Sequence, residues 1–276
     1  MIRIADITDK SRIKELWKLC FTDTDKFIAF YFAKVFRPED TLILEEDGLI
    51  KAALQIIPYT IKTGDQILHA GYISGAMTHP AYRRQGYMVA LLQAAFNKMT
   101  EREMDISFLI PQEQWLFDFY RRYGYTNAFP RFQKKITVDA RLADNVSDAS
   151  LINQEIDYEM YKSLLQRNDP VVLKTEQQIS LLIEDHKISG GKIFAHSGGI
   201  AFVLLHENNV WIKELLYADN NCRDTLLTAI SAYYQPREMY LIQYHRVKAS
   251  SYYGMVKPLK DSVNIPANIY MTMMLD

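Results

Sequence analysis

A strand, a short basic turn and a helix follow one another over residues 66–99, and this stretch limits the possible folds more than any other. Residues 66–78 (QILHAGYISGAMT) are rich in β-branched and aromatic side chains, and Gly75 indicates a bulge or a close approach to the backbone. From about Arg84 onward, apolar side chains recur at helical spacing. The first amides of a helix favour an anion, and Gly86 in the turn lets a ligand approach the backbone, so the stretch predicts a phosphate site.

The turn reads RRQGYM at residues 83–88 and resembles the pyrophosphate loop of the GNAT N-acetyltransferases, Q/R-x-x-G-x-G/A. Its last position, Met88, departs from this pattern. A large apolar residue there resembles the enhanced-intracellular-survival type of aminoglycoside acetyltransferase. The preceding residues 78–82 (THPAY) are similar to the family's passage from strand to loop. Because the motif follows a strand and begins an amphipathic helix, this interpretation is favoured over a basic helix start that only faces solvent.

The resemblance implies acetyl-CoA, or another acyl-CoA, as the co-substrate, and no metal. The pantetheine arm would pair with the backbone of Ala76, Met77 and Thr78, and an amide near Met77 would polarise the thioester carbonyl. The residues implied to hold the pyrophosphate are Arg83, Arg84, Gln85, Gly86, Tyr87 and Met88.

A second motif, FYRRYGY at residues 119–125, resembles the GNAT segment F-Y-x-x-x-G-F/Y at the end of the last helix. The resemblance implies that Tyr120 is the general acid for the departing thiolate. The ordinary pKa of a phenol, about 10, suits the protonation of a thiolate of somewhat lower pKa. The alternative is that Tyr120 is only a core aromatic, since its neighbours at helical spacing are also apolar or aromatic.

The general base is less evident from the residues. In the enhanced-intracellular-survival type the terminal carboxylate serves as the base, which implies Asp276 here. Water-mediated deprotonation by a backbone carbonyl or by Glu113 is an alternative. We expect His69 and His79, on or near the central strand, to be structural.

The element order expected through residue 138, β-α-α-β-β-β-α-β-α-β-β, begins with a strand at Ile2–Ile7 and matches the GNAT order. A polar stretch without periodicity, Arg141–Ser150, predicts a linker. The elements after it repeat the earlier order and end in a strand near Ile269–Leu275. We therefore expect an α/β (α+β) fold of tandem GNAT-like domains, each a mixed central sheet flanked by helices. The predicted domains are a catalytic acyl-CoA-binding domain at residues 1–140 and a degenerate one at residues 151–276.

The second predicted domain lacks a pyrophosphate loop. Its corresponding segment, Ala218–Arg223, has no glycine, and Asp219 would place a carboxylate where a pyrophosphate would lie. The alternative for residues 151–276 is an unrelated α+β fold.

Composition excludes several classes of function. The 276 residues carry a net charge of −1 without long runs of one sign, which argues against nucleic-acid binding as the main task. No apolar run has the length of a membrane span, and the N-terminal residues do not resemble a signal peptide. Two distant cysteines, Cys20 and Cys222, show no metal-ligand spacing and suit a reducing cytoplasm.

The sequence thus predicts a cytoplasmic N-acetyltransferase in which a neutral primary amine attacks acetyl-CoA directly. The acceptor would be a small-molecule amine, aminoglycoside-like or a polyamine, with an amino acid or a protein amine as alternatives, and an oligomer is compatible with this function. Two other functions stay open. One is a non-catalytic acyl-CoA-binding or regulatory protein with the same fold, and the other is a protein-interaction module.

Overall fold

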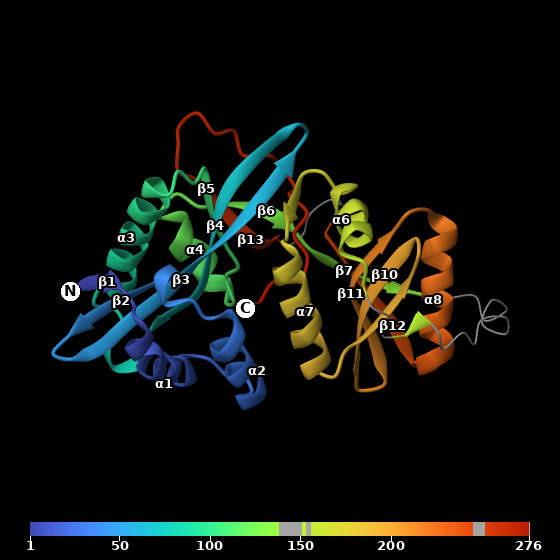
Figure 1. Ribbon diagram of the computed structural model, residues 1–276, viewed down its shortest axis with the longest axis horizontal. Coiled ribbons are helices and arrows are strands. Elements are labelled where there is room, and N and C mark those ends of the chain that lie inside the picture. The colour runs from blue at the N-terminus through green and yellow to red at the C-terminus, as the bar shows by residue number, and fades with distance from the viewer. Residues whose placement is uncertain (138–150, 153–155, 245–251, 276) are drawn as a thin grey trace.

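The computed structural model describes residues 1–137, 151–152, 156–244 and 252–275 (Figure 1). It contains two mixed β-sheets with helices packed against them, so the α/β architecture predicted from the sequence is confirmed. The predicted linker, Arg141–Ser150, lies outside the described residues.

The first half of the chain forms the elements expected of it. Its strands are β1 (Ile2–Ile4), β2 (Thr41–Glu46), β3 (Leu49–Thr63), β4 (Gln66–Thr78), β5 (Ile106–Leu109), β6 (Thr126–Pro130) and β7 (Phe132–Ile136). Its helices are α1 (Lys10–Cys20), α2 (Asp25–Phe30, continued by a π turn at Tyr31–Val35), α3 (Tyr87–Glu101) and α4 (Gln114–Arg121). Strand β1 is shorter than predicted, because Asp6 accepts a hydrogen bond from the Thr8 amide and starts a 3-10 turn at Ile7.

The second half alternates helices with strands. Its helices are α6 (Tyr158–Gln166), α7 (Glu176–Ile188) and α8 (Asn220–Tyr234). Its strands are β8 (Val171–Leu173), β9 (Lys192–His196), β10 (Gly199–His206), β11 (Asn209–Tyr217), β12 (Glu238–Gln243) and β13 (Tyr252–Pro258).

The predicted final strand at Ile269–Leu275 is wrong, and the last strand is β13. Residues 269–275, which we call the tail, make only an isolated bridge between Tyr270 and Val171. The tail is extended and apolar, so its pattern resembles a strand. Its backbone bonds instead to separate segments, with the Ile269 amide donating to Ala128 and the Tyr270 amide donating to Pro170.

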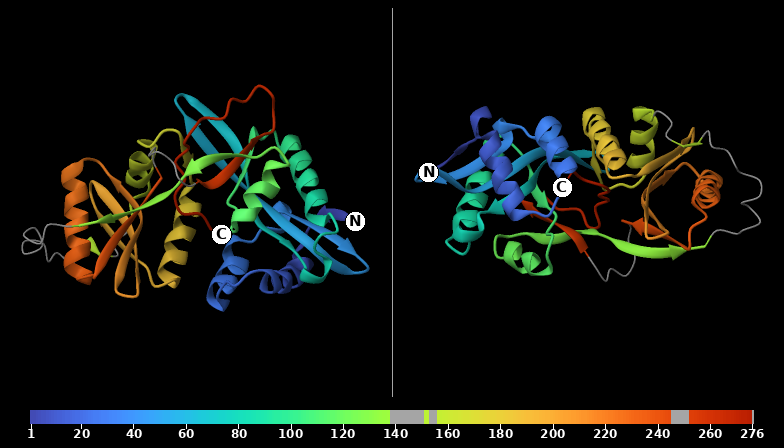
Figure 2. Two further views of the ribbon diagram at one scale, coloured as in Figure 1. Left: turned by 180° about the vertical axis from the view of Figure 1, so that it is seen from behind. Right: turned by 90° about the horizontal axis from the view of Figure 1, so that it is seen from below.

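Strands from each half of the chain take part in both sheets. The larger sheet has the order β1-β2-β3-β4-β5-β13-β6 with β8 paired to β3, and the smaller has the order β7-β12-β11-β10-β9. Strand β13 lies between β5 and β6, whereas β7 continues from the larger sheet to the edge of the smaller one (Figure 2). Strands thus cross the predicted boundary at residue 140, and the proposed division into two domains stays a prediction.

The larger sheet is buried on both faces, which explains its long apolar strands. On one face Leu42 packs in a cluster with Leu92 of α3. On the other face Ile43 and Met77 pack in a cluster with Trp17 of α1. The side chain of Met77 is therefore part of the core, and any role of this residue toward a ligand belongs to its backbone.

A buried polar cluster fixes the tail between the sheets. Lys174 Nζ donates to Thr272 Oγ1 at 2.9 Å, and Tyr161 Oη donates to Glu214 Oε1 at 3.2 Å. Burial lowers the pKa of Lys174 and raises the pKa of Glu214, and the attraction between the two charges opposes both changes. Because these residues come from α6, β11, the β8–α7 connection and the tail, the cluster ties four segments together.

Removing one charge of this cluster should destabilise the protein strongly. In Lys174→Met, Glu214 stays buried without its cation, and we expect the free energy of unfolding to fall by about 3–5 kcal/mol in urea titrations at pH 7. The double variant Lys174→Met/Glu214→Leu should regain most of this loss. Lys187→Met, at an exposed position of α7, is the control and should change stability by less than about 0.5 kcal/mol. A single variant as stable as the control would contradict the coupling.

Candidate active site

The larger sheet opens into a fork in the middle of its length. Strands β4 and β5 pair in parallel from Ala70 and Ile106 to Ile73 and Leu109, where β5 ends. Strand β4 continues to Thr78 with β3 on one side, and among the described residues no strand pairs with its other side. On that side the backbone of residues 74–77 has no strand partner among the described residues and can pair with an extended ligand, whereas the Thr78 carbonyl accepts a hydrogen bond from Arg83 Nε.

A bulge in β4 lies at the base of this fork. Ala53 pairs with Met77 and Gln55 with Ser74, so β4 has one more residue than β3 in this interval. Gly75 has a φ of +55°, and a Cβ on it would lie 2.6 Å from Cζ3 of Trp17. Glycine is required here both by its backbone angle and by the packing of the indole. The bulge changes the direction of the backbone at Ala76 and Met77, the residues predicted from the sequence to bind near the thioester.

The predicted pyrophosphate loop begins α3. Gly86 has a φ of +81°, no atom lies within 4 Å of the position of a Cβ, and Arg84 also has a positive φ of 63°. The first helical hydrogen bond runs from the Ala90 amide to the Gly86 carbonyl, so the amides of residues 87–89 have no helical partner. No side chain caps α3 and its first turn has no acidic residue, so its positive end is open to an anion.

Residues 83–88 are fixed on the sheet by contacts that the sequence did not indicate. Arg83 Nε donates to the Thr78 carbonyl at 3.3 Å, and Tyr87 Oη donates to Glu46 Oε2 at 2.8 Å. Lys51 Nζ donates to the same Glu46 oxygen at 2.7 Å, and its hydrogen bond lowers the pKa of Glu46. Lys51 and Glu46 come from a distant hairpin, so only the fold brings them to the loop.

Tyr120 is placed near the fork but within the core. Its side chain belongs to the same buried cluster as Ile73 and Leu109, where the pairing of β4 with β5 ends. Burial raises its pKa to about 12, which keeps the phenol protonated at neutral pH. Its ring centroid lies 5.6 Å from that of Tyr125, and its hydroxyl has no hydrogen-bond partner among the described residues. The position is compatible with both sequence interpretations, and the role of Tyr120 as the acid stays a prediction.

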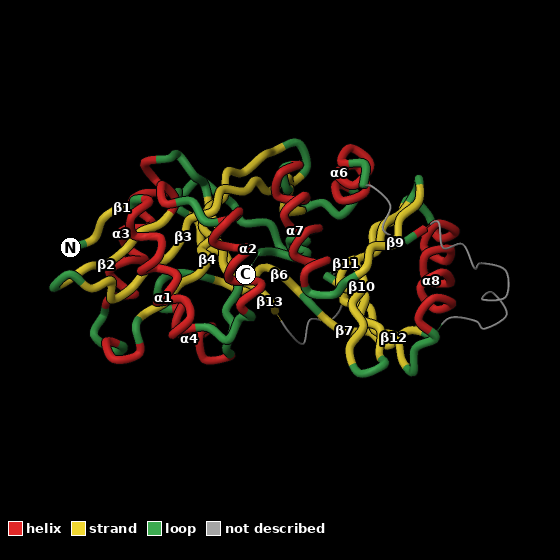
Figure 3. The backbone as a smooth tube through the Cα atoms, turned by 60° about the horizontal axis from the view of Figure 1, so that its bottom comes forward, coloured by secondary structure: helices red, strands yellow, loops and turns green. Residues whose placement is uncertain are grey.

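The structure does not assign a general base among the residues predicted for that role. Asp276 lies outside the described residues, while Leu275 before it is buried beside Phe30 of the π-extended α2 in one cluster. The last described part of the tail lies near α2, between the two sheets (Figure 3). Glu113 is exposed at the start of α4 without a capping bond. His79 Nδ1 accepts from the Ala81 amide at 3.2 Å, a structural role.

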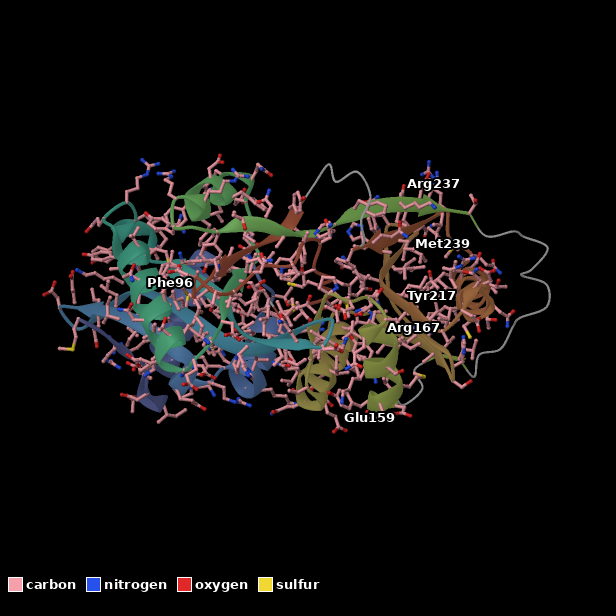
Figure 4. All side chains as sticks on the ribbon, turned by 90° about the horizontal axis from the view of Figure 1, so that it is seen from above. Phe96, Glu159, Arg167, Tyr217, Arg237 and Met239 are labelled. Atoms are coloured by element: carbon pink, nitrogen blue, oxygen red, sulfur yellow. The ribbon has the colours of Figure 1, made fainter. Side chains whose placement is uncertain are left out.

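The corresponding helix start in the second half is closed. The Asp219 carboxylate caps α8 by accepting from the Cys222 amide at 2.8 Å, so this end offers no open anion site. A cavity of about 620 Å³ lies near this helix and is lined by Arg167 and Tyr217, among others, which are labelled in Figure 4.

Metal and membrane features are not found in the part of the chain that the structure describes. No cluster of three or more His, Cys, Asp or Glu side chains could hold a metal ion there. No described helix combines the length and apolar character needed to cross a bilayer.

Comparisons with known proteins agree with this geometry. Residues 1–128 match the family model described as Acetyltransferase (GNAT) domain. The structure is similar to a GCN5-related N-acetyltransferase from Kribbella flavida, with a TM-score of 0.72 and 14% identity over 93% of this chain and 70% of that one. It is also similar to Eis1 from Mycobacterium abscessus, with a TM-score of 0.69 and 11% identity over 94% of this chain and 74% of that one.

A tandem GNAT protein from the clavulanic acid biosynthesis pathway has a TM-score of 0.51 and 11% identity, over 95% of this chain and 100% of that one. At such low identities the similarity of the structures shows the fold. No curated protein sequence matches the chain. Together with the family model, these similarities confirm the GNAT resemblance and the predicted fold class.

The open end of α3 predicts how coenzyme A binding responds to substitution. In Gly86→Asp a carboxylate would face the diphosphate, and we expect calorimetry to show acetyl-CoA affinity reduced by about 100-fold or more. Gly86→Asn, which tolerates a positive φ without adding charge, should reduce affinity much less.

Gly190→Asp is the matched control, because Gly190 has a φ of +82°, no atom near its Cβ position and a place at the far end of α7. Its affinity should equal that of the unchanged protein. Undiminished binding by Gly86→Asp would remove the loop from the site.

Proposed function

We infer that this chain, whose residues 1–128 are an acetyltransferase (GNAT) domain, transfers an acetyl group from acetyl-CoA to a primary amine of a small molecule. The observation that supports this most is the fork between β4 and β5, which lies next to the uncapped start of α3. The fork offers strand backbone groups without a partner among the described strands, and the start of α3 offers amides without a helical partner. An amide-containing arm of a ligand would pair with the strand, and a diphosphate would accept from the helix amides.

The donor would lie along β4 with its thioester at the bulge. The backbone of Ala76, Met77 and Thr78 would pair with the pantetheine arm, and residues 83–88 would surround the diphosphate. An amide near Met77 would donate to the thioester oxygen, which gains negative charge as the amine attacks. Because only backbone groups act here, the side chain of Met77 is free to fill the core.

The reaction would proceed by direct attack. The lone pair of a neutral amine forms the new C–N bond, and the C–S bond then breaks and leaves coenzyme A as a thiolate. The thiolate takes the phenolic proton of Tyr120, while the amine nitrogen loses its proton to water or to a carboxylate. Asp276 stays a candidate for that carboxylate by resemblance only.

An acyl-CoA-binding protein without transfer activity is the second candidate function. It is favoured by one observation, that no base is assigned among the described residues. Release of free thiol from acetyl-CoA in the presence of amines separates the two functions, because a binding protein releases none above the background rate.

A cytoplasmic location belongs to the same proposal. Both cysteines of the chain, Cys20 and Cys222, are free thiols in the structure. Unpaired cysteines are typical of reducing compartments.

Tyr120→Phe tests the proposed acid. The substitution keeps the ring packing and removes only the proton donor, so kcat should fall by about 100-fold. The affinity for acetyl-CoA should change by less than about threefold, because the hydroxyl is not proposed to contribute as much as about 1 kcal/mol to binding of the donor. Because the pKa of Tyr120 is about 12, ionisation of this group should not reduce the rate of the unchanged enzyme between pH 8 and 10.

Tyr125→Phe is the matched control. It removes the 2.6 Å hydrogen bond between Tyr125 and Ser107 in the same cluster, without a proposed step in the chemistry. We expect a loss of about 1 kcal/mol of stability with little change in kcat. Equal turnover in Tyr120→Phe and the unchanged enzyme would assign Tyr120 to the core alone.

A further inference from the structure

We propose that the acceptor carries an acidic group as well as the amine that is acetylated, and that Asp185 and Lys213 bind these two groups in one cavity between the sheets. The acceptor would then belong to the amino acids or short peptides rather than to the polyamines. This inference rests on the acetyl transfer proposed above.

The cavity has a volume of about 290 Å³, near the lower end of the 300–1,000 Å³ typical of small-molecule sites. Its walls include α7 with Asp185, β11 with Lys213, and the tail with Met273 and Met274, besides Arg131, Leu204 and residues of other segments. Thr272, next in the tail, is tied to Lys174, so the buried polar cluster also positions this wall.

Asp185 supplies a negative charge that lacks a partner. Its Oδ1 is buried and has no hydrogen-bond partner among the described residues. Burial, and then the nearby carboxylate of Asp23, raise the pKa of Asp185 to about 6. A buried carboxylate oxygen without a partner, raised in pKa by a second negative charge, favours a bound cation, and the ammonium group of an acceptor is such a cation.

Lys213 supplies a positive charge on another wall. It is the extra residue of a bulge in β11, because Phe202 pairs with Glu214 and Val203 with Ile212. Burial lowers the pKa of Lys213, and the charge of Arg131 lowers it further. Among the described residues no ion pair of Lys213 is found, so a carboxylate or phosphate placed beside Lys213 and Arg131 would be stabilised by both.

The two opposite charges line one cavity without pairing with each other. No ion pair joins Asp185 and Lys213 in the described part of the chain, although both line the cavity. Each partly buried charge lacks a partner of opposite sign among the described residues when no ligand is bound. This burial costs free energy. A ligand with an ammonium group at one end and an acidic group at the other satisfies both walls at once.

Two lines of interactions connect the cavity with the fork through intervening residues. On one side Trp17, which packs against Gly75 at the bulge, donates through Nε1 to Asp23 at 2.8 Å, and Asp23 acts on Asp185. On the other side a neighbouring cavity of about 350 Å³ shares Arg131 and extends to Phe117 of α4. The α4 helix follows β5, so this second side leads to the other arm of the fork.

Matched acceptors that differ only by a carboxylate test the proposal. The pairs are lysine and cadaverine, ornithine and putrescine, arginine and agmatine, and phenylalanine and phenethylamine. Thiol release from acetyl-CoA gives kcat/KM for each. We expect the carboxylated member to be favoured at least tenfold in the pairs that react. A decarboxylated member that reacts as well as its partner would overturn the proposal.

Two variants test which group of the acceptor each wall of the cavity binds. Lys213→Met should lower kcat/KM at least tenfold for the carboxylated acceptors and change it less than threefold for the diamines. Asp185→Asn should lower it for both sets. Lys187→Met, on the exposed side of α7, is the control. Equal losses for both sets in Lys213→Met would contradict a role in recognising the acidic group. Calorimetry with acetyl-CoA checks that each variant still folds and binds the donor.

Binding separates this inference from the proposed function. The same amino acids and amines are titrated by calorimetry into protein saturated with coenzyme A. Tighter binding of the carboxylated members, lost in Lys213→Met, supports the cavity even if no thiol is released, and in that case only the transfer reaction is refuted. Absence of any preference for the carboxylated members in binding overturns the inference while leaving acetyl transfer intact.

Discussion

The separation of β4 from β5 after Ile73 and Leu109 is the constraint on which the proposed site depends. Two adjacent parallel strands normally continue their ladder, and here the ladder stops while β4 runs on for five residues. The bulge at Gly75 turns the backbone, and Trp17 fills the space that any side chain at this position would need. Strand amides that would otherwise be satisfied within the sheet are thereby left for a ligand.

The second half of the chain completes this arrangement by adding walls. Asp185, Lys213 and the tail line one cavity, in a structure where β13 and β7 are exchanged between the sheets and Lys174 holds Thr272. The first half alone contains the elements for the donor. The polar groups proposed for the acceptor come mostly from the second, so in this proposal donor and acceptor specificity have separate origins in the sequence.

Local patterns were sufficient to predict the elements of the proposed site that are adjacent in the chain. Strand β4 and the loop at Gly86 follow from residue type and order, because strand, turn and helix are adjacent in the chain. The wrong strand at Ile269–Leu275 and the missed β13 show the opposite case. Both segments are apolar and extended, and which of them joins a sheet is decided by distant partners, such as Leu109 for Met255 and Pro170 for Tyr270. The unpaired charges of Asp185 and Lys213 are likewise unremarkable in sequence, since only burial makes them unusual.

The place of β13 has a consequence for how the chain acquires its structure during synthesis. Because β13 lies between β5 and β6, the larger sheet is incomplete until residues 252–258 have left the ribosome. Until then the edge of β5 is exposed while the whole second half is made. Such late, long-range pairing slows folding. It also leaves an unpaired strand edge on the nascent chain, which chaperones would protect from aggregation. The two halves would therefore reach the native state together rather than one after the other.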